Sequence, residues 1–287
     1  MAAPCCPAGS HGAAPPDDVD LQGSWEKHAD LDCYMVGEKE KPSSVIFAFS
    51  DVFGVLSGRH RRICDDIAAS VPGSLVCLPD LFHGDPIAPD FSDSRFPRMR
   101  QKLFMPKMVY RIRYRFGWAQ VGPDIQGLVD SLKEQHAVPF MAFGFCYGGY
   151  VMAKACTTGF FSAGVGFHPS PIVATLQCQP HNQKMPDLAK EVKCPLLMVP
   201  ADNDDATVKP GGEFMQLLAA SFPTSKSVCY ESMLHGWMTR GVGDPVLPQK
   251  AGVETIREAH ASALKLAVDF FMQHAQHASP VPASSVS

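Results

Sequence analysis

A cysteine framed by glycines follows an apolar segment near the middle of the 287-residue chain. The residues from Met141 to Tyr150 read MAFGFCYGGY, which places one glycine two positions before Cys146 and another two positions after it. This spacing is the nucleophile-elbow pattern G-x-S-x-G with cysteine in place of serine. Small residues are needed there because the chain turns sharply from a strand into a helix. The N-terminus of that helix would favour the thiolate, which is the nucleophilic form of the side chain.

A base and an acid follow this cysteine in the order that the elbow requires, which is nucleophile, then acid, then histidine. His235 lies beside a glycine in a loop that follows an apolar segment. The acidic loop 201–205 also follows an apolar segment and offers Asp202, Asp204 and Asp205 as rival carboxylates. A thiol, an imidazole and a carboxylate in this order predict nucleophilic catalysis by cysteine.

Short apolar segments alternate with helical patterns along the chain, as in βαβ units on a parallel sheet. Because the carboxyl ends of parallel strands meet at one edge of the sheet, the polar residues that follow them are expected to lie together there. The pattern predicts an α/β fold, with a mostly parallel sheet and helices on both faces. The expected strands are 44–49, 74–78, 140–143, 164–167, 196–199 and 227–230, and the expected helices are 58–70, 97–116, 124–135, 147–157, 210–220 and 253–276.

The two ends of the chain differ in composition from the part between them. Residues 1–22 are rich in Ala, Pro, Gly and Asp, and residues 277–287 are rich in Ser, Pro, Ala and Val. Neither segment shows a hydrophobic period, so we expect two disordered tails around one folded domain that covers residues 23–276.

The composition excludes several classes of partner. The formal charge is −4 and hydrophobic residues make up 46% of the chain, which indicates a globular protein without a basic surface for nucleic acid. We find neither a signal peptide nor a membrane span, so we expect a cytoplasmic protein without a membrane partner. No Cys and His cluster has ligand spacing, and we expect no metal and no cofactor. We expect a monomer or a weak homodimer.

Further motifs resemble those of the dienelactone hydrolase family, the carboxymethylenebutenolidases. Besides GFCYGG at the elbow, they read SDVFGV at 50–55, PDLFHGDP at 79–86, FHP at 167–169 and HGW at 235–237. They occur in order and span about residues 23–275, which is nearly the whole expected domain. The resemblance implies an α/β-hydrolase fold that cleaves small esters or lactones through an acyl-thioester.

The resemblance also implies a role for each matching position. Cys146 would be the nucleophile, and His235 would be the general base and later the general acid. Asp204 would orient the imidazole, because ADND resembles the family's small-acidic-x-Asp pattern. Asp202 and Asp205 remain its rivals.

Other positions would stabilise charge or hold the substrate. The backbone N–H groups of Val52 and Tyr147 match the family's oxyanion hole. Asp51 stands where bacterial members carry a Glu that contacts the resting thiol, and its side chain is one methylene shorter. Arg240 is a candidate for an arginine that binds the substrate carboxylate, with a supporting role as the alternative. We expect His168 to be a structural histidine near the site.

Two other functions stay open from the sequence. One is a catalytically silent hydrolase-fold protein that binds a ligand or partner. The complete set of cysteine, acidic loop and histidine argues against that reading. The other is a glycan hydrolase, but the acidic residues of the loop 201–205 lie together, whereas a glycosidase needs two carboxyl groups that flank a sugar.

Overall fold

The computed structural model describes residues 20–88, 97–178, 183–240 and 251–275. Within the helix that begins at residue 97, side chains are described from residue 106 onward. Except for residues 20–22, the two predicted tails lie outside the described residues.

Among the described residues, an eight-stranded sheet forms the centre of the molecule, in the order β1-β2-β4-β3-β5-β6-β7-β8. The strands from β4 to β8 pair in parallel, whereas β1 and β2 form an antiparallel hairpin at one edge. This sheet confirms the mostly parallel arrangement that the sequence predicts. The strands are β1 (Ser24–His28), β2 (Leu31–Gly37), β3 (Ser44–Phe49), β4 (Ser74–Pro79), β5 (Phe140–Phe145), β6 (Phe161–Phe167), β7 (Leu196–Val199) and β8 (Lys226–Ser227).

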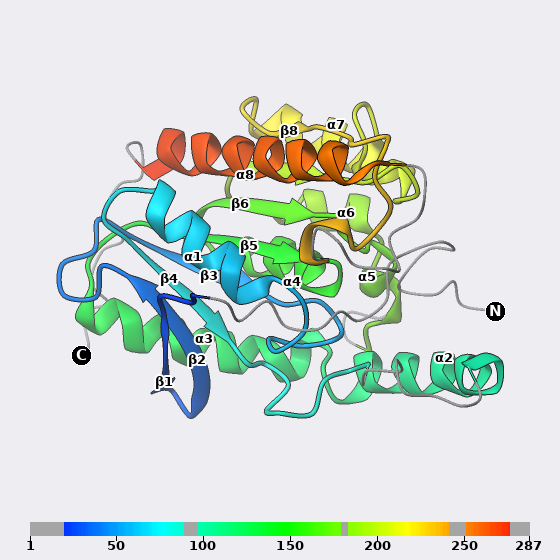
Figure 1. Ribbon diagram of the computed structural model, residues 1–287, viewed down its shortest axis with the longest axis horizontal. Coiled ribbons are helices and arrows are strands. Elements are labelled where there is room, and N and C mark those ends of the chain that lie inside the picture. The colour runs from blue at the N-terminus through cyan, green and yellow to red at the C-terminus, as the bar shows by residue number, and fades with distance from the viewer. Residues whose placement is uncertain (1–19, 89–96, 179–182, 241–250, 276–287) are drawn as a thin grey trace.

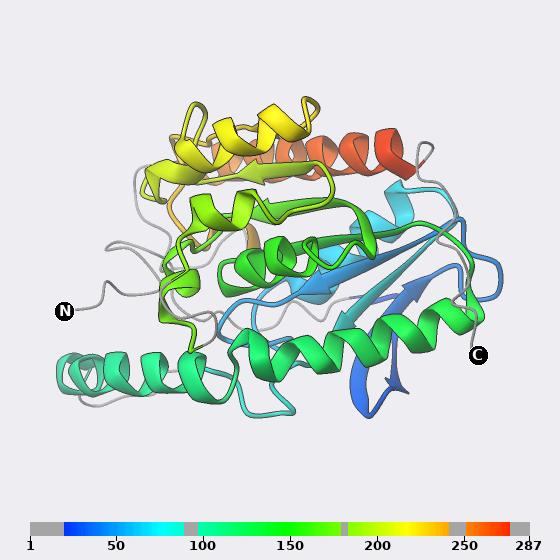
Figure 2. The same ribbon diagram turned by 180° about the vertical axis from the view of Figure 1, so that it is seen from behind.

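Helices cover both faces of the sheet. Figure 1 shows α1 and α8 across one face, and Figure 2 shows α3 and α4 across the other. The helix α2 extends past the edge of the sheet (Figure 1). The helices are α1 (His60–Ser70), α2 (Pro97–Tyr114), α3 (Trp118–Gln135), α4 (Tyr147–Ala155), α5 (Ile172–Leu176), α6 (Met185–Ala189), α7 (Glu213–Ser221) and α8 (Val253–Ala275), with short 3-10 turns η1 (Ala206–Val208) and η2 (Trp237–Thr239).

The central strands are apolar throughout because both of their faces are buried. All six residues of β3 are buried, and they alternate between two separate cores. Ile46 and Ala48 pack with α1 and α8, whereas Val45, Phe47 and Phe49 pack on the side of α3 and α4. Burial on both faces explains why the sequence shows continuous apolar runs rather than alternation.

The hairpin of β1 and β2 is absent from the predicted strands. Ala29 and Asp30 form its two-residue loop, since His28 pairs with Leu31. Both loop residues have positive φ, 46° and 65°. This geometry is usually signalled by Asn-Gly or Asp-Gly, which the loop lacks. All five residues of β1 are exposed or half-buried, so the strand has no apolar pattern that could predict it either.

Candidate active site

Cys146 lies between β5 and α4 with φ 52° and ψ −112°, a backbone conformation that residues other than glycine rarely adopt. The glycines on either side allow the surrounding chain to come close. A Cβ added to Gly144 would lie 2.0 Å from the carbonyl oxygen of Gly148, and a Cβ on Gly148 would lie 2.1 Å from that of Phe49. The glycine frame therefore lets α4 pack directly on the end of β3 and presents the sulfur at the carboxyl edge of the sheet.

Gly148→Ala should destabilise the fold because the new methyl group would meet backbone rather than a movable side chain. We expect the free energy of unfolding to fall by about 1–3 kcal/mol, the usual cost of overpacking, with a lower Tm in calorimetry. Gly252→Ala is the matched control, since a Cβ there would meet nothing within 4 Å. Equal Tm values for the two variants would contradict the close backbone contact at Gly148.

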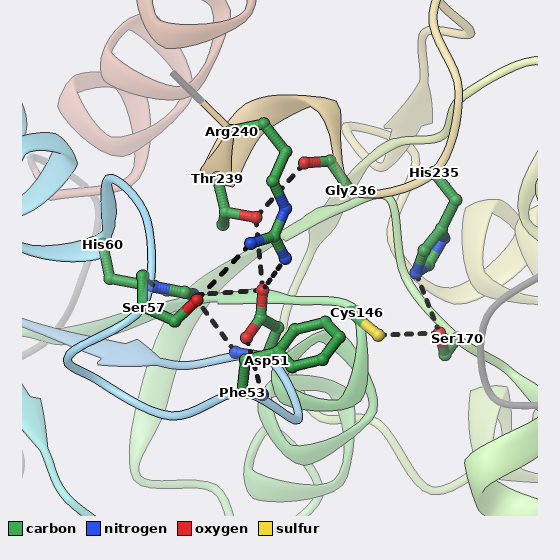
Figure 3. A network of polar contacts seen from close by, with 10 residues as sticks. All are labelled: Asp51, Phe53, Ser57, His60, Cys146, Ser170, His235, Gly236, Thr239 and Arg240. Atoms are coloured by element: carbon green, nitrogen blue, oxygen red, sulfur yellow. Dashed lines mark hydrogen bonds and ion pairs between the residues drawn. The ribbon is translucent and has the colours of Figure 1, made fainter. Parts of the chain in front are cut away.

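The loop after β6 holds the backbone of the elbow on both sides of the cysteine. The N–H of Cys146 donates to the carbonyl of Phe167 at 3.2 Å, and the carbonyl of Cys146 accepts from the N–H of Ser170 at 3.1 Å. The Sγ of Cys146 lies 3.2 Å from the Oγ of Ser170, and Figure 3 draws this contact as a dashed line. Two backbone hydrogen bonds thus fix the position of the hydroxyl relative to the sulfur.

His235 and Asp204 meet in the buried interior at the same edge of the sheet. The Nδ1 of His235 lies 2.5 Å from the Oδ1 of Asp204. The other carboxylate oxygen of Asp204 accepts from the N–H of Ala201 at 2.7 Å, and the N–H of His235 donates to the side chain of Asn203 at 2.7 Å. The Nε2 of His235 faces the cysteine side and lies 3.4 Å from the Oγ of Ser170 (Figure 3).

The other two acids of the loop have different surroundings. Asp202 is exposed, and its backbone N–H donates to the carbonyl of Met233. Asp205 is also exposed, and its carboxylate accepts from the backbone and hydroxyl of Thr207 at the start of η1. Of the three rivals, Asp204 is the one that contacts the imidazole.

The protonation of His235 depends on two negative neighbours. Burial alone would lower the pKa of this imidazole, but attraction to Cys146 and Asp204 and hydrogen bonds with both outweigh the desolvation and raise the pKa to about 10. The imidazole therefore carries a positive charge at neutral pH when the thiol is ionised. The coupling is reciprocal, so the imidazolium favours the thiolate of Cys146 to the same extent.

The carboxylate of Asp51 is buried in a separate cluster beside the thiol. It accepts from the guanidinium of Arg240 at 2.9 Å, from the hydroxyl of Thr239 at 3.2 Å and from the N–H of Phe53 at 2.9 Å (Figure 3). The ring of Phe53 also lies 5.1 Å from the guanidinium carbon. Within the described part of the chain, the thiol is not among the hydrogen-bond partners of Asp51.

His60 supports this cluster as a neutral imidazole. Its Nδ1 contacts the carbonyl of Ser57, and its Nε2 accepts from the N–H of Asp51 at 3.3 Å. Burial lowers the pKa of His60, although the nearby Asp51 opposes that shift. Arg240 is 1% exposed, so Asp51 balances the charge of an arginine that lies almost wholly in the interior.

Val52 and Tyr147 follow the adjacent strands β3 and β5 at the carboxyl edge of the sheet. Phe49 of β3 pairs with Gly144 of β5, so both residues lie three positions past this pair. Tyr147 begins α4, and the carbonyl of Val52 accepts from the N–H of Ala88 at 2.8 Å. No hydrogen bond to the N–H of Val52 occurs among residues that the structure describes.

Ser170 and the packing of His168 are features of the site that the sequence did not single out. His168 is wholly buried with φ 35°, and its ring lies edge-to-face against His235 at a centroid distance of 5.0 Å. Burial and nearby positive charge hold the pKa of His168 well below its usual range. His168 belongs to the FHP motif, and Ser170 follows it directly. The position of this motif at the end of β6 was the feature of the sequence that could have indicated both residues.

The described residues hold neither a cluster of metal ligands nor a membrane-spanning helix. None of their His, Cys, Asp and Glu side chains form a group of three or more that could hold a metal ion. No helix within the described ranges is both long and apolar enough to span a bilayer.

Relatives of known sequence match much of the chain. An uncharacterized AIM2 family protein of Schizosaccharomyces pombe is 27% identical over 239 residues, which cover 82% of this chain and 88% of the relative. The hydrolase pyvD of Aspergillus violaceofuscus is 27% identical over 168 residues, which cover 58% of this chain and 61% of that protein.

Solved structures share the fold at low sequence identity. The protein m3DLH matches with a TM-score of 0.60 and 16% identity, over 88% of this chain and 98% of its own. The dienelactone hydrolase of Anabaena variabilis matches with a TM-score of 0.51 and 15% identity, over 88% of this chain and 99% of its own. The model of the dienelactone hydrolase family matches residues 31–275. The predicted α/β-hydrolase fold is therefore confirmed, and the chain belongs to the dienelactone hydrolase family.

Proposed function

We propose that this hydrolase cleaves small esters or lactones, with Cys146 as the nucleophile, His235 as the general base and acid, and Asp204 as the orienting acid. One observation carries the proposal. The thiol of Cys146 lies in a strained elbow, the imidazole of His235 contacts the carboxylate of Asp204 at 2.5 Å, and its Nε2 faces the thiol across the hydroxyl of Ser170.

Acylation begins when the thiolate of Cys146 attacks the carbonyl carbon and a carbon–sulfur bond forms. The oxyanion that develops is stabilised by the N–H groups of Val52 and Tyr147; one such donor typically contributes about 10²- to 10³-fold in rate. The bond to the alcohol breaks as the imidazolium of His235 gives its proton to the leaving oxygen.

Deacylation reverses the roles of the groups. Neutral His235 takes a proton from water, the resulting hydroxide attacks the thioester, and the carbon–sulfur bond breaks. The carboxylate of Asp204 holds Nδ1 protonated, so that Nε2 is the basic nitrogen on the substrate side. The acid product leaves, and the thiolate and the imidazolium form again.

The nucleophile and the support around it narrow the substrate class. A thiolate attacks activated carbonyls readily but expels poor leaving groups less readily, so we propose esters and lactones rather than amides.

The Asp51–Arg240 ion pair joins the loop after β3 to η2, and we propose that it supports the site rather than binding substrate, because the pair is buried and neutral.

Alkylation by iodoacetamide tests whether Cys146 is the ionised nucleophile. Cys178 is exposed and Cys146 is 2% exposed, so access alone would favour Cys178. We expect Cys146 to react about tenfold faster at pH 7, because only thiolates react and a free thiol is mostly protonated there. Because the pKa of His235 is near 10, its imidazolium persists, and the rate should stay nearly constant from about pH 7 to 9. Peptide mass spectrometry would measure both cysteines in one sample.

A panel of aryl esters, lactones and dienelactones then tests the reaction itself. Rapid acid quench during turnover should trap the acyl group on Cys146, and mass spectrometry should locate it there. Faster alkylation of Cys178 together with no turnover of any panel member would instead favour the catalytically silent binding protein.

A further inference from the structure

The contacts around the sulfur indicate a fourth participant in the proposed reaction. We infer that Ser170 is a positioning residue whose hydroxyl links the thiol of Cys146 to the imidazole of His235 and carries the proton between them. The inference rests on the proposed function. It comes from the Oγ of Ser170, which lies 3.2 Å from Sγ and 3.4 Å from Nε2.

The position of the hydroxyl is fixed by the backbone on both sides of it. The N–H of Ser170 donates to the carbonyl of Cys146 at 3.1 Å, and its carbonyl accepts from the N–H of Val173 at 3.1 Å. Ser170 is also 3% exposed, so bulk water cannot easily replace its hydroxyl. The side chain therefore has little freedom to leave the space between Sγ and Nε2 (Figure 3).

A hydroxyl can serve both charge states of the pair because it donates one proton and accepts another. With the thiol neutral, S–H donates to Oγ and the Ser170 hydroxyl donates to Nε2. Transfer breaks the S–H bond of Cys146 and forms an O–H bond on Ser170, while the original hydroxyl proton moves to Nε2 of His235. The serine ends unchanged, the sulfur carries the negative charge and the imidazole carries the positive charge.

In the ionised state, the same hydroxyl stabilises both charges. Nε2–H of the imidazolium donates to Oγ, and the Oγ–H donates to the thiolate. Hydrogen bonds to a charged partner are roughly twice as strong as neutral ones. This arrangement adds a hydrogen bond from Ser170 to the interaction of the thiolate with His235, while the carboxylate of Asp51 is directed to Arg240.

The other titratable and charged groups that face the pair have contacts of their own. Asp204 contacts the far side of the imidazole, and buried His168 stays neutral because burial lowers its pKa. On the side of β3 and η2, Asp51 and Arg240 form an ion pair, and the buried imidazole of His60 from α1 stays neutral for the same reason as His168. A change in the pH profile on removal of the hydroxyl can therefore be assigned to the thiol and His235.

Ser170→Ala tests the inference, with Ser170→Thr as the variant that keeps a hydroxyl. We expect the alanine variant to lose about 10- to 100-fold in kcat with KM changed by less than about twofold. The midpoint of the pH profile for Cys146 alkylation should rise by about one pH unit. The threonine variant should recover most of both effects. Ser162→Ala is the matched control, because that hydroxyl donates to the carbonyl of Phe140 and should leave both readouts unchanged.

The possible failures can be told apart. Loss of kcat in Ser170→Ala without a shift in the alkylation profile would indicate a purely structural role and overturn the inference. Unchanged kcat would also overturn it, while an acyl group trapped on Cys146 would leave the proposed function standing. An acyl group trapped on Ser170 would overturn both, because it would make the serine the nucleophile.

Discussion

Cys146→Ala should lower kcat/KM for p-nitrophenyl acetate by about 10⁴-fold or more, since an alanine cannot form the acyl intermediate and the remaining groups can only assist water. The fold should survive, because the change removes one sulfur and leaves the backbone of the elbow as it is. Alanine has the same Cβ as cysteine, so the positive φ of 52° costs the variant no more than the parent. Initial rates at several ester concentrations would measure the effect, and Tm would report on folding.

Cys178→Ala serves as the control for that experiment. Cys178 is exposed and follows α5, so its removal should change kcat/KM by less than about twofold. Near-normal hydrolysis by Cys146→Ala, with the control also active, would exclude Cys146 as the nucleophile.

The elbow could be predicted from the sequence because its requirements are local. Gly144 and Gly148 each lie two positions from Cys146, and the steric reason for both glycines lies in the chain around the elbow. The order of Cys146 before the acidic loop and His235 follows from the topology of a parallel sheet, in which polar residues at successive strand ends meet. Local sterics and strand order were thus enough to indicate the main groups.

The choice among the three acids needed coordinates. Asp202, Asp204 and Asp205 occupy one short loop, and a difference of one residue decides whether a carboxylate turns inward. Asp204 turns toward Ala201 and His235, whereas Asp205 turns outward to cap η1. Such a choice depends on backbone directions within a turn, which the family pattern indicated but residue types alone did not.

The contacts of Asp51 could not be predicted from the sequence for a different reason. Its partners Thr239 and Arg240 lie 188 and 189 positions away in the sequence, and His60 belongs to α1. Long-range polar contacts of this kind have no period or spacing in the sequence. The same holds for Ser170, whose contact with His235 spans 65 positions.

Asp204→Asn should reduce kcat by about 10⁴-fold, the size of loss found when a triad carboxylate becomes an amide. The amide of the variant can donate to Nδ1 of His235, which places the ring proton on Nε2 and removes the basic nitrogen from the substrate side. Loss of a negative charge 2.5 Å from the ring also lowers the pKa of His235 from about 10, because the imidazolium loses its partner. The alkaline limb of the kcat/KM profile should therefore move to lower pH.

Asp202→Asn is the matched control, because it makes the same chemical change two residues earlier on an exposed side chain. It should alter kcat by less than about twofold and leave the pH profile in place. A large loss in Asp202→Asn with a mild effect in Asp204→Asn would reassign the acid. Mild effects in both variants would mean that neither Asp202 nor Asp204 is the orienting acid.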